Sequence, residues 1–132
     1  MTLLRAVLVA IALPAASLAQ FNTAAEVKPI LKMIKPQWVS VREFNGQDLL
    51  YFTLLEVYRC GIDQIRYVIN DGKPRVWETP PCEGDDAFSK IPEGRLPYAT
   101  FGVKTVKKVR IELTYDDGTA EWAEYTRKDI KQ

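Results

Sequence analysis

Three short turn motifs constrain the fold of this chain more than any other feature of its sequence. FNGQ at residues 44–47, NDGK at 70–73 and DDGT at 116–119 each place Asn or Asp directly before Gly, between apolar runs. Such pairs tolerate the positive φ angles that tight hairpin turns require. The motifs therefore predict three antiparallel hairpins, which join residues 38–44 to 47–60, 62–69 to 74–79 and 106–116 to 119–127.

Alternation of apolar and polar residues supports two of these strands. Residues 108–115 alternate regularly, and residues 62–69 do so with Val68 as an exception. A period of two places each apolar set on one face of a sheet, so both strands are predicted to have one buried and one solvated face. The predicted buried residues are Ile65, Tyr67, Ile69, Val109, Ile111, Leu113 and Tyr115.

The run at residues 49–57 is apolar on both faces apart from Thr53 and Glu56. This pattern predicts a central strand that is covered on two sides, although the composition also allows a helix. The Asn-Gly turn ahead of the run and its aromatic residues favour the strand. A bend is expected between residues 55 and 60.

A short helix is predicted near residues 23–34. Thr23 and Glu26 have the spacing of a capping box. Pro29 opposes a regular helix because it lacks the amide hydrogen and clashes with the preceding turn, so the helix is expected to be short, kinked or late in starting. Its apolar stripe, which would pack on the sheet or close the core, consists of Val27, Ile30, Leu31 and Ile34.

These elements predict a mainly β domain, an immunoglobulin-like antiparallel sandwich of six or seven strands with a short N-terminal helix. The spacing of the two cysteines does not match the inter-sheet disulfide of antibody domains, so a sandwich is predicted without membership of that superfamily. A small β-barrel is the alternative fold.

The N-terminal sequence predicts export. An apolar run at residues 6–13 follows Arg5, and Ser17 and Ala19 occupy the positions expected before a signal-peptide cleavage site. The run is too short for a membrane span, which needs about 20 apolar residues. The prediction is a signal peptide at residues 1–19 and a single periplasmic or secreted domain at 20–132.

The two cysteines, Cys60 and Cys82, are predicted to form a structural disulfide, because an exported chain meets an oxidising environment. The alternative is a redox-active pair. Thioredoxin-like chemistry uses two cysteines separated by two residues, and the wide spacing found here favours the structural bond.

The chain contains no histidine. This excludes Ser-His-Asp and Cys-His catalysis and the usual zinc and copper sites, so no catalytic residue, metal or cofactor is predicted. A hydrolase that uses two carboxylates is the enzymatic alternative, with Glu83, Asp85, Asp86 and Glu93 in one loop-like segment. Their spacing does not match a calcium-binding loop.

Charge indicates neither nucleic acid nor membrane as a partner. The chain has 18 basic and 17 acidic residues, and the predicted signal peptide contains one of the basic residues, Arg5, and none of the acidic ones. The remaining domain is formally neutral and has no long-range field to attract a polyanion. The expected partner is a protein or a small ligand.

The central part of the chain resembles a group of small exported bacterial proteins of no assigned activity. The likeness lies in Trp38, Val39, Val41 and Arg42, in GQDLLYFT at 46–53 and in RCG at 59–61, and it continues more weakly through LPY at 96–98 and YDDGT at 115–119. The resemblance implies export and a single domain. It supplies no site residues.

The favoured function is therefore a non-enzymatic binding or interaction module. Trp38 and Trp122 are predicted to be core residues, and Trp77 is predicted to be partly exposed and to contact a ligand. An inhibitor of an extracytoplasmic enzyme, which would act through the loop at residues 83–95, is the second hypothesis. The candidate binding residues are Trp77, Glu83, Asp85 and Asp86.

Overall fold

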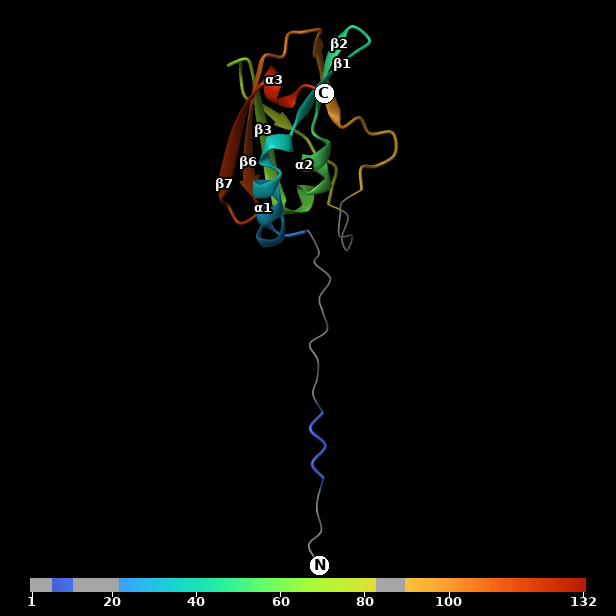
Figure 1. Cartoon of the computed structure of the whole chain (residues 1–132), viewed down its shortest axis with the longest axis vertical. Coiled ribbons are helices and arrows are strands. Elements are labelled where there is room, and N and C mark those ends of the chain that lie inside the picture. The colour runs from blue at the N-terminus through green and yellow to red at the C-terminus, as the bar shows by residue number, and fades with distance from the viewer. Residues whose placement is uncertain (1–5, 11–21, 83–89) are drawn as a thin grey trace, which may run out of the picture.

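The computed structural model describes residues 6–10, 22–82 and 90–132 of the chain. Two antiparallel sheets form a mainly β sandwich, with strand orders β1-β2-β5 and β4-β3-β6-β7 (Figure 1). The strands are β1 (Ser40–Phe44), β2 (Gln47–Tyr51), β3 (Ile62–Ile69), β4 (Arg75–Trp77), β5 (Tyr98–Gly102), β6 (Lys108–Tyr115) and β7 (Ala120–Thr126). The helical elements are α1 (Ala24–Met33), η1 (Lys35–Gln37), α2 (Thr53–Val57), η2 (Arg59–Gly61) and α3 (Arg127–Ile130).

All three predicted hairpins are confirmed. Asn45 and Gly46 connect β1 to β2 with φ angles of 52° and 74°. Asn70 and Asp71 begin the turn between β3 and β4 with φ angles of 52° and 59°. Gly118, with a φ angle of 83°, lies in the turn between β6 and β7. The left-handed backbone of each turn explains why Asn, Asp and Gly occupy these positions.

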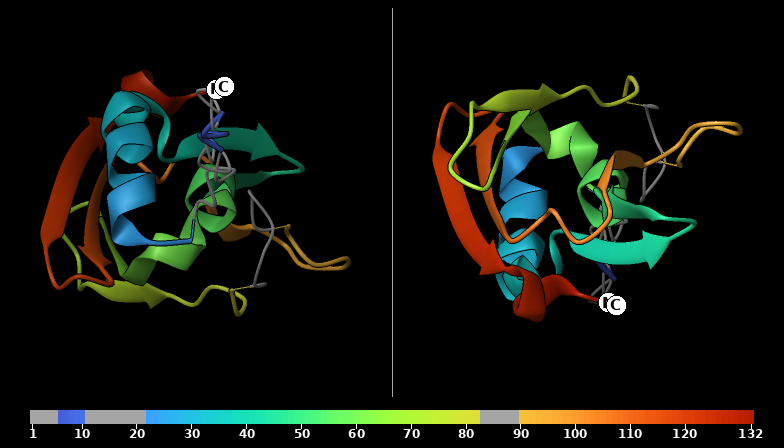
Figure 2. Two further views of the ribbon diagram at one scale, coloured as in Figure 1. Left: turned by 90° about the horizontal axis from the view of Figure 1, so that it is seen from below. Right: turned by 90° about the horizontal axis from the view of Figure 1, so that it is seen from above.

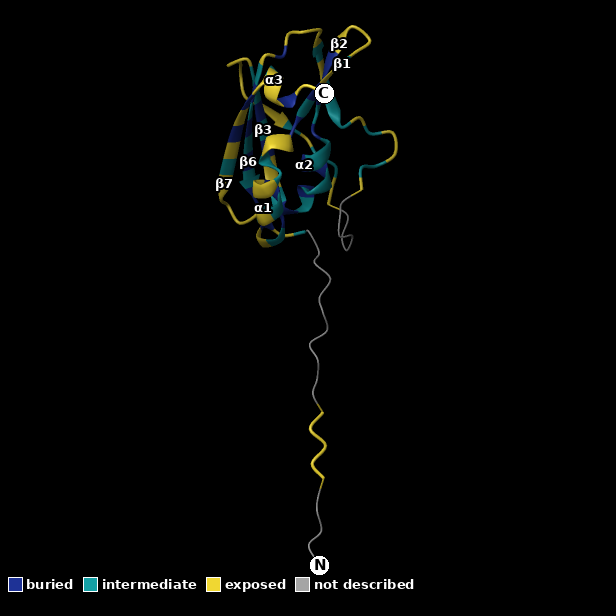
Figure 3. Cartoon of the chain, in the orientation of Figure 1, coloured by how far each residue is buried: buried dark blue, intermediate teal, exposed yellow. Residues whose placement is uncertain are grey.

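The predicted faces of β3 and β6 are also confirmed. Ile65 and Tyr67 of β3 are buried, and Ile69 is partly buried against the same core. The four apolar residues of β6 are buried, and the polar residues between them are partly exposed. The same alternation is visible along β7 in Figure 3.

The prediction of one long strand through residues 49–57 is wrong. β2 ends at Tyr51, and α2 and η2 follow before β3 begins. Phe52 leaves the extended conformation, with a ψ angle of 19°, and its amide donates to the carbonyl of Pro97 at 2.8 Å. The continuous apolar run arises because β2 is the middle strand of its sheet, whereas α2 directs Leu55 into the core. Short apolar runs do not distinguish these two cases.

The predicted N-terminal helix is confirmed as α1, which contains Pro29. The capping-box prediction is wrong, because the Thr23 hydroxyl donates to Glu26 Oε1 at 2.8 Å and caps no backbone amide. Val27 and Leu31 are completely buried. Figure 2 shows α1 and α2 in the space between the two sheets, with β7 on the outer side of α1.

A buried ion pair connects β2 to α3, which directly follows β7. Asp48 of β2 is fully buried and receives hydrogen bonds from Arg127 and from the amides of Lys104 and Val106, all between 2.7 and 3.0 Å. Arg127 also donates to Glu43 at 2.9 Å. The Arg127 hydrogen bonds, opposed by desolvation and assisted by the two amides, hold the pKa of the Asp48 carboxyl well below its usual range.

The depressed pKa of Asp48 predicts a specific loss of stability in acid. Above the unfolded-state pKa of about 4, the charged carboxylate stabilises the fold, and this contribution falls as the pH drops below that value. Asp48→Asn is expected to cost about 2 kcal/mol of unfolding free energy at pH 7, in the range for hydrogen bonds to a charged group. In urea denaturation, the difference in unfolding free energy between the variant and the unmodified protein should shrink as the pH falls below about 4, and it should continue to shrink below about pH 2. Asp63→Asn, at an exposed position of β3, serves as the control. A difference in unfolding free energy that stays constant with pH would contradict the depressed pKa of Asp48.

Candidate functional site

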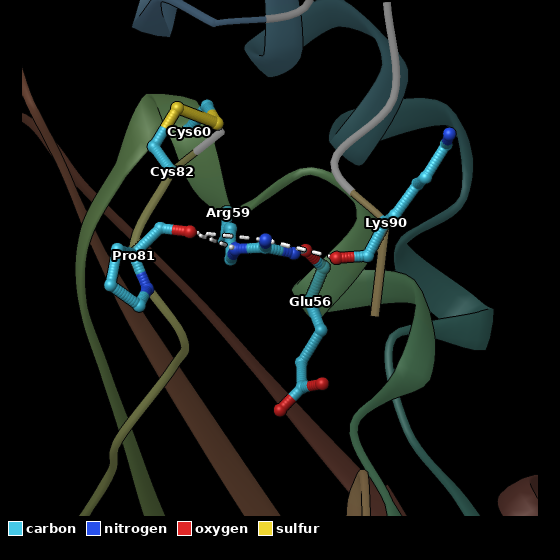
Figure 4. Close-up of a disulfide and its surroundings, with 6 residues drawn as sticks. All are labelled: Glu56, Arg59, Cys60, Pro81, Cys82 and Lys90. Carbon is cyan, nitrogen blue, oxygen red and sulfur yellow. Dashed lines mark hydrogen bonds between the residues drawn. A yellow bond between two sulfur atoms is a disulfide. The ribbon is translucent and has the colours of Figure 1, made fainter. Parts of the chain in front are cut away.

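The predicted disulfide between Cys60 and Cys82 is present and connects η2 to the segment that follows β4 (Figure 4). The Cα atoms of the two cysteines are 5.0 Å apart. Residues 6–10, 22–82 and 90–132, which the structure describes, contain no free cysteine. A bond of this kind is compatible with an oxidising, exported compartment.

The neighbouring Arg59 fastens the same segment through backbone carbonyls. Its guanidinium is buried and donates to the carbonyls of Glu56 at 3.0 Å, Pro81 at 3.1 Å and Lys90 at 3.0 Å (Figure 4). Arg59 thereby holds the chain on both sides of residues 83–89. Sequence reasoning missed this role, because a buried arginine bonded to carbonyls leaves no local pattern.

A second buried charged side chain, Glu56, lies on α2, the helix just before η2. Glu56 of α2 is completely buried, and its Oε1 atom receives hydrogen bonds from Arg95 Nε at 2.8 Å and from Trp77 Nε1 at 3.0 Å. Its Oε2 atom is buried and has no hydrogen-bond partner among the described residues. The three side chains come from α2, β4 and the segment ahead of β5, so they tie distant parts of the chain together.

Trp77 is half-buried, and its ring is already occupied by contacts within the protein. Phe52 stacks on it with ring centroids 4.1 Å apart, and the Arg95 guanidinium lies 5.5 Å from its centroid. Trp77 therefore belongs to a structural cluster with Glu56 and Arg95, and little of its aromatic surface remains for a ligand. The other candidate binding residues, Glu83, Asp85 and Asp86, lie outside the described residues.

Arginine side chains hold the buried carboxylates that the structure describes. Glu56 and Asp48 are the buried ones, and each receives hydrogen bonds from an arginine. Glu93 is exposed. In residues 6–10, 22–82 and 90–132, no three His, Cys, Asp or Glu side chains are grouped closely enough to hold a metal ion.

Another tryptophan, on β7, is exposed. Trp122 is 54% exposed, and the prediction that it is a core residue is wrong. Ala123 and Tyr125 of the same strand are buried, so the alternation of the strand places Trp122 on the outer face of the sheet. There the Arg110 guanidinium of β6 lies 4.3 Å from the centroid of its ring. Trp38, by contrast, is completely buried as predicted.

A groove runs between β7 and the end of α1, with a volume of about 1120 Å³. Met33, which is 77% exposed, lies on the helical side of the groove, and Trp122 lies on the strand side. We call it the α1–β7 groove. Its lining is formed by Lys32, Met33, Lys35, Pro36, Asp129 and the residues of β7 from Ala120 to Tyr125.

Two contacts hold the walls of the α1–β7 groove in place. The Tyr125 hydroxyl donates to the carbonyl of Lys35, and Lys35 Nζ lies 3.5 Å from Glu121 Oε1. Glu121 also accepts a hydrogen bond from the Tyr115 hydroxyl at 2.7 Å. The groove is therefore largely preformed, which lowers the entropic cost of binding there.

Comparison with protein-family models, curated proteins and solved structures found no significant match for this chain. Within residues 6–10, 22–82 and 90–132, no helix is long and apolar enough to cross a membrane.

Proposed function

We propose that the protein is an exported, non-enzymatic interaction module that binds a segment of a partner protein in the α1–β7 groove. The observation that carries the proposal is the exposure of Trp122 and Met33 on opposite sides of one groove. Tryptophan offers a flat apolar face and dominates the energy of many interfaces. Methionine is unbranched and adapts to different partner surfaces.

Export is supported by two features. The N-terminal sequence has the pattern of a signal peptide with cleavage near Ala19. The Cys60–Cys82 disulfide is of the kind that persists outside the reducing cytosol. Together they favour a periplasmic or secreted protein, whose partners would belong to the same compartment.

The experiment is a binding selection with a phage-displayed library of seven-residue peptides on the oxidised protein. We expect the selected peptides to bind Trp122→Ala at least about tenfold more weakly than the unmodified protein, because truncation of a central interface tryptophan costs more than about 1.4 kcal/mol. Isothermal titration calorimetry would measure both dissociation constants.

The matched control is Phe44→Ala. Phe44 is 53% exposed, close to the 54% of Trp122, but it lies on β1 in the other sheet. Peptides that bind Phe44→Ala with unchanged affinity and Trp122→Ala weakly support the α1–β7 groove. Equal losses in the two variants, or a selection that yields no peptide dependent on Trp122, would overturn the proposed function.

A further inference from the structure

β7 is an edge strand with a free row of backbone hydrogen-bonding groups. The ladder with β6 is antiparallel and regular, and it ends in hydrogen bonds from the Tyr115 amide to the Thr119 carbonyl and from the Arg127 amide to the Lys107 carbonyl. Antiparallel strands alternate hydrogen-bonded and non-hydrogen-bonded pairs. The odd-numbered residues of β7 are therefore bonded to β6, and the even-numbered residues direct their backbone groups away from the sheet.

The outward backbone groups of the even-numbered β7 residues are available for pairing with another strand. In the part of the chain that the structure describes, no hydrogen bond outside the β6–β7 ladder involves the backbone of Ala120, Trp122 or Glu124. The amide of Thr126, the next even residue, donates to Asp129 at 2.9 Å as the cap of α3. The free row thus covers three alternate residues and ends where α3 begins.

Other edges in the two sheets are shorter or partly covered. The Gln132 amide donates to the Val41 carbonyl of β1 at 2.8 Å, and Lys131 forms a bridge to the same residue. β4 has three residues, and β5 has five. β7 has seven residues and an unbroken register. Natural proteins protect edge strands because an exposed edge pairs with other chains, so a long free edge indicates a surface for pairing.

The α1–β7 groove lies along this free edge, because it is lined by exposed residues of β7 and by Lys32, Met33, Lys35 and Pro36. A strand added to a sheet lies about 4.8 Å from its neighbour, which places a single extended chain within the groove. A second copy of this protein would bring its own α1 and η1 alongside its own β7. Both copies would then have to fit these residues beside one groove, whereas an extended segment adds only the width of one strand, so a single strand is the simpler occupant.

We propose that an extended peptide segment of a partner protein adds to β7 as the next strand of the sheet. This inference rests on the proposed function and specifies how the partner binds. Backbone pairing with Trp122 and Glu124 would provide affinity, and pockets for alternate side chains would provide specificity. Figures 1 and 2 show β7 at the rim of its sheet, with α1 beside it.

The groove also indicates the chemistry of the peptide. Its outward side chains would lie beside Trp122, where aromatic or β-branched residues pair well across strands. Its inward side chains would face Met33 and Pro36 and the basic pair Lys32 and Lys35. Lys32 has no ion-pair partner among the described residues, because its ammonium group is in none of their salt bridges. The lining also contains Glu121, Glu124 and Asp129, and Lys35 is already paired with Glu121. A segment that alternates apolar residues and places an acidic residue beside Lys32 therefore fits best.

Hydrogen exchange tests the backbone pairing directly. A peptide that depends on Trp122, selected as above, is added to saturation, and amide exchange is followed by NMR. We expect the amides of Trp122 and Glu124 to exchange at least about tenfold more slowly in the complex, because each gains a partner that excludes solvent. The amides of Ala123 and Tyr125, already bonded to β6, should change little and serve as internal controls.

A matched pair of variants tests the same point through affinity. Glu124→Pro removes the outward amide hydrogen, a change that edge strands tolerate on their free side. Glu124→Ala removes the same side chain and keeps the amide hydrogen. We expect the proline variant to bind the peptide roughly tenfold more weakly than the alanine variant, since one backbone hydrogen bond contributes up to about that factor. Thermal unfolding verifies that both variants remain folded.

The outcomes separate this inference from the proposed function. If the peptide depends on Trp122 but leaves the Trp122 and Glu124 amides unprotected, the groove binds through side chains alone and strand addition is wrong. If no peptide depends on Trp122, the proposed function fails and this inference fails with it. If Glu124→Pro instead disrupts a dimer of this protein that competes with the peptide, a second copy and not a partner peptide occupies the edge.

Discussion

Replacing Arg95 with Met is expected to lower the free energy of unfolding by about 3 kcal/mol. The substitution removes the guanidinium that donates to Glu56, which is completely buried. Trp77 would remain as the donor to Oε1, and Oε2 already lacks a partner among the described residues. A buried charge left without its partner lowers the unfolding free energy by about 3–5 kcal/mol. The lower end of this range applies because the Arg95 side chain is 27% exposed, so water can replace some of its interactions.

A double-mutant cycle with Glu56→Gln distinguishes this cause from lost packing. Glutamine keeps the shape of the side chain and removes its charge, so the double variant should recover a large part of the stability lost in Arg95→Met. Urea denaturation, followed by tryptophan fluorescence, measures the four unfolding free energies. If Arg95→Met lowers the unfolding free energy by less than about 1 kcal/mol, the Arg95–Glu56 pair contributes no more than a surface ion pair, and the prediction is wrong.

Replacing both Cys60 and Cys82 with Ala is expected to lower the free energy of unfolding by roughly 3 kcal/mol. The two cysteines are separated by 22 positions, and the bond restricts the unfolded chain by closing the loop between them. Arg59 holds Pro81 and Lys90 by separate hydrogen bonds, so the folded segment should keep its arrangement without the disulfide.

The reduced form of the unmodified protein is the matched control for this double variant. If the disulfide acts through the unfolded chain, the reduced protein and the variant should unfold at the same urea concentration, below that of the oxidised protein. Thiol alkylation with and without prior reduction would verify the redox state of each sample. Equal midpoints for the oxidised and reduced forms would contradict a stabilising role and would reopen the redox alternative for these cysteines.

Several elements of the fold could be predicted from local features of the sequence. The turn at Asn45 and Gly46 and the turn at Gly118 require positive φ angles, which few residue types adopt. The buried face of β6 follows from strict alternation over residues 109–115. The disulfide followed from the compartment that the N-terminal sequence indicates, together with the presence of two cysteines.

The candidate site could not be predicted in the same way. Trp77 lies in a strand of three residues, and the sequence of β7 mixes polar and apolar residues on both faces, so either Trp77 or Trp122 could have faced the core. Pairing of β7 with β6 places Ala123 beside Ile111 on the buried face, so Trp122 takes the opposite face. Pairing of β4 with β3 places Trp77 beside Ile65, directed to the core. Strand register therefore determines which tryptophan is available to a partner.

The sequence by itself determined the hairpins, the disulfide and the helical stripe of α1, because turn geometry and apolar periodicity depend on residues close together in the chain. Tertiary structure decided the end of β2 at Tyr51, the exposure of Trp122 and the arginine partners of Glu56 and Asp48. Those partners lie 39 and 79 positions away. Contacts over such distances form only when the sheets and helices pack, so no local pattern records them.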